Sequence, residues 1–121
     1  MYEVINYSGN SPISKGINLI GLELSCSEMN ELKSGNYISL AGRSLSEIGS
    51  VFILASALAA VNSGKTKKTI TFQDLPEAVT DSACCAGIPI YCWDSGNSGK
   101  SYLYLTLVDG EPAVRICCHS Q

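Results

Sequence analysis

Two apolar runs on either side of Asp109-Gly110 constrain the fold more than any other part of the sequence. An Asp-Gly pair between strands favours a two-residue type I′ turn, so it predicts a β-hairpin over Ser101–Cys118. The turn places Val108 opposite Glu111, and the alternation of a pleated strand then brings four aliphatic side chains to one face. These residues, which we expect in the core, are Leu103, Leu105, Val114 and Ile116.

The opposite face of the predicted hairpin is aromatic and carries a cation. Its expected cross-strand pairs are Tyr102–Cys117, Tyr104–Arg115 and Thr106–Ala113. A guanidinium framed by phenol rings suits a planar, anionic ligand. The alternative is an exposed strand arginine that stacks on Tyr104, and the sequence leaves both interpretations open. We take Tyr102, Tyr104 and Arg115 as candidate ligand-binding residues.

A capping box, Ser44-x-x-Glu47, marks the start of an unusual helix. In such a box each side chain bonds to an exposed backbone N–H of the other residue. The helix should run from about Leu45 to Asn62 and end at Gly64, since glycine commonly ends helices. Apolar side chains surround almost its whole circumference, unlike those of an ordinary surface helix. We therefore expect it in a central position or covered by a second subunit.

A second, amphipathic helix is predicted from near Asp74, with Pro76 in its first turn, to Gly87. Runs of β-type residues flank both helices. They are Tyr2–Tyr7, Ile17–Leu24, Tyr37–Leu40, Thr69–Phe72, Ile88–Trp93, Tyr102–Val108 and Ala113–Cys118. The order of these elements predicts an α+β fold in a single domain, residues 1–121, with a mainly antiparallel sheet and two helices.

Composition restricts the partners of the chain. Its 121 residues are 45% hydrophobic and 16% charged, which suits one well-filled core. A net charge of −3 without a basic face argues against duplex nucleic acid as a partner. The longest apolar stretch, Val51–Val61, is much shorter than the ~20 residues of a membrane-spanning helix. The first residues lack a secretory signal, so we expect a cytoplasmic protein with no membrane association.

Six cysteines and one histidine give little support for a metal or a catalytic centre. The cysteines form no C-x-x-C pair, and neighbours on a strand point to opposite faces, which disfavours a shared metal. In a cytosolic protein all six should stay reduced. The histidine, His119, lies near the C-terminus, and no third group is visible that would orient it beside a cysteine nucleophile. We expect no metal, no cofactor and no enzymatic activity.

Two further segments could meet a nucleotide. Arg43 precedes the capped helix, where exposed N–H groups and the helix dipole attract an anion, although an ordinary loop arginine fits the sequence as well. Trp93 and Asp94 open a glycine-rich segment that ends in Gly-Lys-Ser. It is no phosphate-binding P-loop, because Asp94 occupies the position of the first glycine and a strand follows. The indole can stack on a base and the carboxylate can accept from a ribose. The alternative is a flexible hairpin loop with a core tryptophan.

Three stretches of the sequence carry a resemblance to a known family: Gly16–Leu24, Gly35–Ser50 and Tyr91–Asp94. Over most of its length the chain resembles the phage anti-Thoeris proteins of the first described type. The resemblance implies a signal sponge in the host bacterial cytosol. Such a protein holds cyclic ADP-ribose isomers, made by bacterial TIR-domain immune proteins, without cleaving them. The resemblance also implies a hexamer and a separate site for cyclic trinucleotides.

The sequence therefore predicts a non-enzymatic protein that sequesters cyclic ADP-ribose-type immune signals. Six candidate residues are compatible with a pyrophosphate, a ribose and an adenine: Arg43, Trp93, Asp94, Tyr102, Tyr104 and Arg115. The alternative function is that of a small phage or mobile-element inhibitor that contacts a host defence enzyme directly. Mimicry of DNA is disfavoured within that class, because 11 acidic residues against 8 basic ones are not a dense negative surface. A self-assembling structural subunit is a third possibility.

Overall fold

The hairpin around Asp109-Gly110 forms the centre of the fold. Strand β6 (Gly99–Val108) and strand β7 (Glu111–Ser120) are joined by this turn, and both turn residues have the positive φ angles, 52° and 79°, that a type I′ turn requires. The register pairs Val108 with Glu111, and it aligns the predicted core residues Leu105–Val114 and Leu103–Ile116. The predicted hairpin and its register are therefore confirmed.

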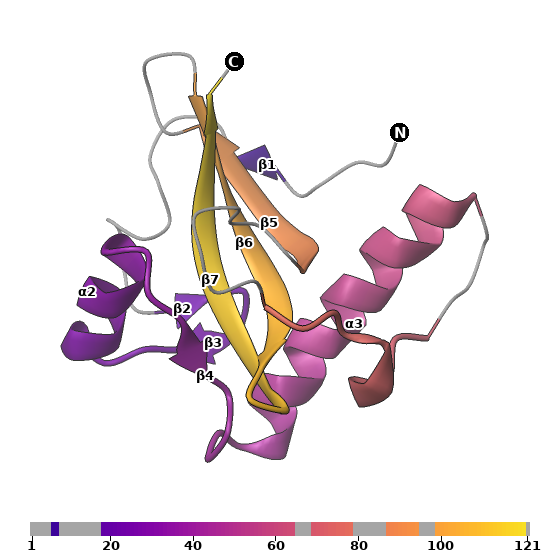
Figure 1. Ribbon diagram of the computed structural model, residues 1–121, viewed down its shortest axis with the longest axis horizontal. Helices are drawn as coiled ribbons and strands as arrows, with labels where there is room; N and C mark the ends of the chain where they lie inside the picture. Colours follow the sequence, from indigo (N-terminus) through magenta and orange to yellow (C-terminus); the bar gives the residue numbers. More distant parts are fainter. Residues whose placement is uncertain (1–5, 8–17, 65–68, 79–86, 95–98, 121) are drawn as a thin grey trace.

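The computed structural model describes residues 6–7, 18–64, 69–78, 87–94 and 99–120. Around the hairpin, β5 (Ile88–Asp94) pairs with β6, and β4 (Ile38–Ser39) pairs with β7, both antiparallel. A short β1 (Asn6–Tyr7) adds a parallel edge to β5, which gives the order β1-β5-β6-β7-β4 (Figure 1). The predicted α+β fold with a mainly antiparallel sheet and two helices is confirmed.

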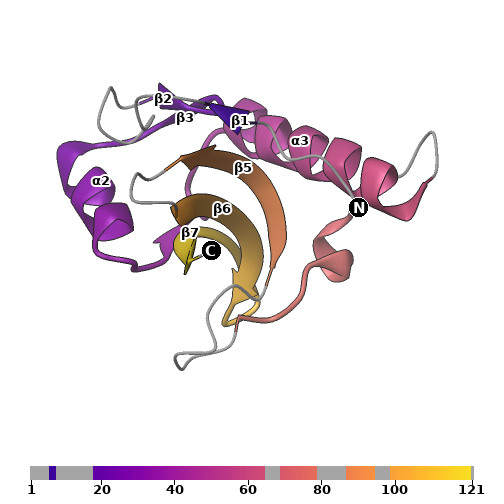
Figure 2. The same ribbon diagram turned by 90° about the horizontal axis from the view of Figure 1, so that it is seen from above.

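The apolar helix α3 (Leu45–Ser63) covers one face of this sheet and runs beside β5 (Figure 2). The predicted capping box is present: the Ser44 N–H donates to Glu47 Oε1 at 3.2 Å, and the Glu47 N–H donates to Ser44 Oγ at 3.3 Å. Among the described residues, no helix has both the length and the hydropathy needed to cross a bilayer.

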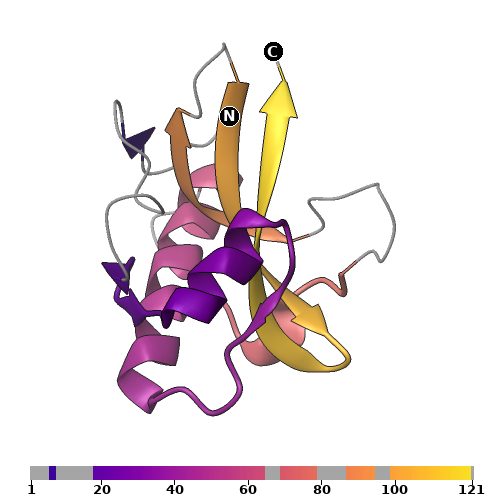
Figure 3. The ribbon, with the colours of Figure 1, turned by 90° about the vertical axis from the view of Figure 1, so that its left-hand side faces the viewer.

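The core lies between α3 and the sheet. It also includes residues of α2 (Cys26–Lys33) and of the segments before and after it. Its fully buried side chains are mainly aliphatic. The largest are Leu19, Leu22, Leu32, Leu40, Ile90, Leu103, Leu105, Val51 and Val114. Figure 3 shows the hairpin turn and the N-terminal end of α3 at the same end of the molecule.

The predicted helix from Asp74 to Gly87 is wrong in its first part. Residues 76–78 are extended: the Leu107 N–H donates to the Pro76 carbonyl at 3.0 Å, and the Ala78 N–H donates to the Leu107 carbonyl at 2.8 Å. Residues 76–78 bond to the last part of β6, which β5 leaves uncovered because its pairing with β6 begins at Leu105. Hydrogen bonding to this open sheet edge therefore outweighed the local helix propensity. Residues 79–86 of the prediction lie outside the described residues.

Among the described residues, the helix that accompanies α3 is α2, which the sequence interpretation missed. It begins with a capping box of its own, in which the Glu28 N–H donates to Ser25 Oγ and the Ser25 N–H donates to Glu28 Oε1. The same Ser-x-x-Glu signal was therefore present in the sequence, without the long apolar run that made α3 conspicuous.

Of the predicted strands, one is divided, one is absent, and a third lies largely outside the described residues. The run Ile17–Leu24 is split into β2 (Asn18–Leu19) and β3 (Leu22–Glu23) by a tight turn. The run Thr69–Phe72 forms no strand, because the Thr71 N–H and hydroxyl both donate to the Asp74 carboxylate at the 3-10 helix η1 (Phe72–Asp74). Of Tyr2–Tyr7, the described part is β1.

Candidate functional site

The second face of the hairpin carries the predicted tyrosines and arginine in the predicted register. Tyr102 pairs with Cys117 and Tyr104 with Arg115, and the Tyr102 and Tyr104 rings lie 6.0 Å apart with a tilt of 35°. Tyr104 is only 8% exposed, and Cys117 is buried as well. This part of the face is therefore a packed layer in which Tyr102 is the more accessible ring.

Arg115 is held by the segment that links α2 to β4. Its Nε donates to the Gly35 carbonyl at 2.7 Å. The guanidinium carbon lies 5.0 Å from the centroid of the Tyr37 ring, within the range of a cation–π contact, and Nη1 lies 3.4 Å from the Tyr37 hydroxyl. The ring beneath the guanidinium is thus Tyr37, where the sequence suggested Tyr104. We call Tyr37, Tyr102, Tyr104 and Arg115 the tyrosine–arginine face.

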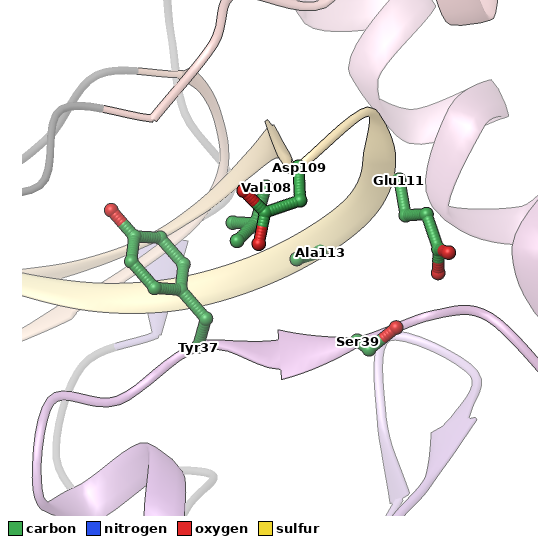
Figure 4. Close-up of a pocket in the computed structure, with 6 residues that line it drawn as sticks. All are labelled: Tyr37, Ser39, Val108, Asp109, Glu111 and Ala113. Atoms are coloured by element: carbon green, nitrogen blue, oxygen red, sulfur yellow. The ribbon is translucent and has the colours of Figure 1, made fainter.

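An open pocket of about 320 Å³ lies at the turn end of this face (Figure 4). The residues that line it come from β4 with the residue before it, and from both sides of the hairpin turn. They are Tyr37, Ser39, Val108, Asp109, Glu111 and Ala113. We call this the hairpin pocket. Tyr37 joins it to the tyrosine–arginine face, since the same side chain lines the pocket and contacts Arg115.

The lining of the hairpin pocket offers a flat ring, a hydroxyl and two carboxylates. Asp109 and Glu111 are exposed at the turn, and the turn backbone is held because the Asp109 N–H donates to Glu77 Oε1 at 3.1 Å. Ser39 Oγ accepts from the Ala41 N–H at 3.1 Å. Carboxylates accept from hydroxyl and amino groups and repel phosphates, so the pocket suits the ribose or base of a nucleotide better than its pyrophosphate.

Arg43 lies at a separate place, between β3, α2 and α3. It donates from Nη1 to the Glu23 carbonyl at 2.7 Å and forms an ion pair with the Glu28 carboxylate. The Arg43 guanidinium, followed by the Ser25 N–H, lowers the pKa of Glu28 below its ordinary value of 4.5. Arg43 therefore has a protein carboxylate as its partner, and its contacts are distinct from those of Arg115.

The N-terminus of α3 also has an internal anion. The Glu47 carboxylate accepts from the Glu23 N–H at 3.2 Å and from the Ser44 N–H and hydroxyl. These bonds, that from Glu23 first, lower the pKa of Glu47. At the start of α3, the Ser44 N–H is thus engaged by the Glu47 carboxylate, and the Glu47 N–H by Ser44 Oγ, so two of the N–H groups that the sequence suggested for a ligand anion have protein acceptors.

Trp93 and Asp94 lie at the end of β5, at the register positions of Ser101 and Lys100 on β6. Their side chains and the glycine-rich residues 95–98 lie outside the described residues. The backbone alone places these two residues at the end of the sheet away from the hairpin turn, because Gly99, not Val108, is near them in the register.

Of the six predicted residues, the structure brings Tyr102, Tyr104 and Arg115 together and gives Arg43 a different environment. Sequence reasoning missed Tyr37. Its position beside Arg115 follows from the pairing of Ile38 with Val114. These two residues lie more than 70 positions apart in the chain, and local sequence patterns do not determine the register between such distant segments.

Within the described part of the chain, no group of three or more His, Cys, Asp or Glu side chains could hold a metal ion. Cys26 is an exposed, free thiol, and Cys92 and Cys117 are buried. No protein-family model matches the chain, and neither a curated protein nor a solved structure matches it.

Proposed function

We propose that this protein binds and sequesters a cyclic ADP-ribose-type signalling nucleotide at the tyrosine–arginine face and the adjoining hairpin pocket. In this proposal it acts without cleaving the ligand, in the cytosol of a bacterial host, and thereby lowers the free concentration of an immune signal. The observation that carries the proposal is the shared position of Tyr37, whose ring contacts the Arg115 guanidinium and lines the pocket.

The chemistry of the tyrosine–arginine face and of the hairpin pocket suits a ligand with one anionic end and one hydroxyl-rich end. The exposed carboxylates of Asp109 and Glu111 suit ribose hydroxyls or an exocyclic amine. Arg115, which is partly exposed on the same sheet face, supplies the positive charge that a pyrophosphate requires. A nucleotide placed with its nucleoside over Tyr37 and its phosphates toward Arg115 satisfies both preferences.

The size of the hairpin pocket suits a ligand that is only partly enclosed. A volume of about 320 Å³ lies at the lower end of ligand pockets, which span roughly 300–1,000 Å³. It suits a nucleoside portion, while the remainder of a cyclic dinucleotide-like ligand would lie along the tyrosine–arginine face. The resemblance also implies a separate site for cyclic trinucleotides, and no feature of the described residues locates that site.

Isothermal titration calorimetry against a nucleotide panel tests the proposal. The panel contains cyclic ADP-ribose isomers prepared with TIR-domain enzymes, linear ADP-ribose, NAD and adenosine. We expect one of the cyclic isomers to bind with a Kd of about 1 μM or tighter, since ring stacking and a charge-assisted contact act together. Linear ADP-ribose should bind more weakly because it is not preorganised.

Two carboxamide variants locate the nucleoside end. Asp109→Asn keeps a residue that tolerates positive φ, so the turn is preserved while the charge is removed, and Glu111→Gln makes the same change on β7. Each should weaken the cyclic nucleotide by about threefold to tenfold if its carboxylate accepts from a ribose. Glu23→Gln, at an exposed position on β3, is the matched control and should not weaken binding, because the loss of a distant carboxylate reduces repulsion of an anionic ligand. An equal weakening there would show that the effect is not specific to the pocket. No binding by any member of the panel would favour the direct inhibitor of a host enzyme.

A further inference from the structure

The side chains of β7 that border the hairpin pocket follow a fixed order of charge. Glu111, Ala113 and Arg115 are alternate residues of one strand, so their side chains lie on the same sheet face. A strand rises about 3.3 Å per residue, which separates Glu111 from Arg115 by roughly 13 Å along β7. Tyr37 lies beside Arg115, and in Figure 4 Tyr37 and Glu111 lie at opposite ends of the pocket lining. The pocket therefore has an aromatic end next to a cation and an acidic end at the hairpin turn.

The acidic end of the hairpin pocket carries three carboxylates. Asp109 and Glu111 line the pocket and are exposed, and Glu77 lies at the same turn, where its Oε1 accepts from the Asp109 N–H at 3.1 Å. Within the described part of the chain, the carboxylates of Asp109 and Glu111 have no hydrogen-bond or ion-pair partner, unlike those of Glu28 and Glu47. Two carboxylates are therefore available to a ligand, and all three make this end of the pocket negative.

Such an acidic end distinguishes a hydroxyl group from a phosphate. An ionised carboxylate can only accept hydrogen bonds, so it binds a ribose hydroxyl, whereas a phosphate monoester carries a charge of about −1.5 to −2 at pH 7 and is repelled. Proteins that bind NAD commonly direct an acidic side chain at a ribose hydroxyl of the adenosine, and an arginine accommodates the 2′-phosphate of NADP instead. A phosphate on a ribose in this pocket would meet Asp109 and Glu111, while Arg115 lies at the other end.

We infer that the hairpin pocket accepts only a nucleoside end whose ribose carries no phosphate, an inference that rests on the proposed function. Asp109 and Glu111 are then the specificity-determining residues, because they accept from hydroxyl groups and exclude phosphate monoesters. The same chemistry restricts the reaction that supplies the ligand, which must begin with a dinucleotide that lacks a 2′-phosphate. A cyclic signal made from a 2′-phosphorylated dinucleotide would escape this protein.

Calorimetry of the full chain with matched pairs of nucleotides tests the inference. The pairs are ADP-ribose, NAD and N1-linked cyclic ADP-ribose, each with and without a 2′-phosphate on the adenosine. We expect the phosphate to weaken binding at least about tenfold in every pair that binds. If a cyclic isomer binds but the phosphate has a smaller effect, or if none of the three unphosphorylated nucleotides binds beside that isomer, the inference is wrong and the proposed function stands. If no cyclic isomer binds, both fail.

Substitutions at the acidic end test whether the discrimination arises there. Glu111→Arg replaces an exposed carboxylate by the cation that accommodates a 2′-phosphate, so it should reverse the preference within a pair. Asp109→Asn keeps the turn and should reduce the discrimination at least about threefold. Glu23→Arg makes the same change of charge at an exposed position on β3, and its ratio of affinities should stay within about threefold of the wild-type ratio. A wild-type ratio in Glu111→Arg, or an equal reversal in Glu23→Arg, would overturn the inference.

Discussion

The guanidinium carbon of Arg115 lies 5.0 Å from the centre of the Tyr37 ring, and Arg115 Nε donates to the Gly35 carbonyl at 2.7 Å. These two contacts fasten the segment after α2 onto β7. They also position the ring that lines the hairpin pocket. Under the proposed function, Tyr37 would contribute both to stability and to nucleotide binding, so two substitutions at this position are informative.

Tyr37→Phe and Tyr37→Ala separate the hydroxyl from the ring. The hydroxyl lies 3.4 Å from Arg115 Nη1, a long contact, so the loss of this contact in Tyr37→Phe should change the unfolding free energy by less than about 0.5 kcal/mol. Tyr37→Ala removes the cation–π contact and should cost about 1–2 kcal/mol. In calorimetry, Tyr37→Phe should keep nucleotide affinity within about threefold, and Tyr37→Ala should weaken it at least about tenfold. Equal affinity in all three proteins would place the nucleotide elsewhere.

Arg115→Ala should lower both stability and affinity, because Arg115 has structural partners. The loss of the Gly35 bond and of the Tyr37 contact should cost about 1–2 kcal/mol in urea unfolding. If the guanidinium also meets a phosphate, nucleotide affinity should fall about tenfold to a hundredfold. Binding measured at a temperature where the variant is fully folded keeps the two effects apart. A destabilised variant with wild-type affinity would show that Arg115 serves the fold alone.

The ion pair of Arg43 with Glu28 predicts a pH-dependent stability. The folded-state pKa of Glu28 is lowered, so its contribution is present above about pH 4.5 and is lost as pH falls through the folded pKa. Arg43→Ala should cost about 1 kcal/mol at pH 7, a modest amount because Glu28 is partly exposed. The cost should shrink at pH 3, and it should also shrink at pH 7 in a Glu28→Gln background. A cost independent of pH and of Glu28 would contradict the assignment.

Gly87 is predicted to be the least replaceable described glycine. A Cβ atom there would lie 2.9 Å from the Leu105 carbonyl oxygen and 3.2 Å from Tyr104 Cβ, and the φ angle is 149°. Gly87→Ala should therefore destabilise the fold by roughly 3 kcal/mol, since backbone strain and overpacking add. Gly110→Ala is the control: its φ is 79°, but its surroundings are open, so it should cost about 1–2 kcal/mol. Thermal unfolding that ranks Gly110→Ala as the more damaging change would refute this account of the β5–β6 contact.

The parts of the fold that could be predicted from the sequence have short-range determinants. The Asp109-Gly110 turn fixes the register of β6 and β7 by itself, and Ser44 with Glu47 fixes the start of α3. The region around Pro76 was predicted wrongly because its backbone bonds to Leu107, which lies about 30 residues away. The turn between β2 and β3 was hidden for another reason: Ile20 adopts a φ of 51°, which a β-branched residue rarely does.

The candidate site was predictable to the extent that it depends on the hairpin. The alternation along β6 and β7 placed Tyr102, Tyr104 and Arg115 on one face. Whether that face is open could not be read from the alternation, and Tyr104 is in fact largely buried. The environment of Arg43 could not be predicted from the sequence either, because tertiary packing brings Glu23 and Glu28 close to it.

If the protein captures a cyclic nucleotide without chemical change, the ligand that it releases on denaturation should be intact. The protein is incubated with a cyclic ADP-ribose isomer that binds in calorimetry, freed of unbound ligand, and denatured by heat. The supernatant is then analysed by chromatography and mass spectrometry. We predict recovery of the intact cyclic nucleotide, about one molecule per occupied site. Recovery of linear ADP-ribose or another breakdown product, with intact ligand in a heated control that lacks the protein, would contradict it.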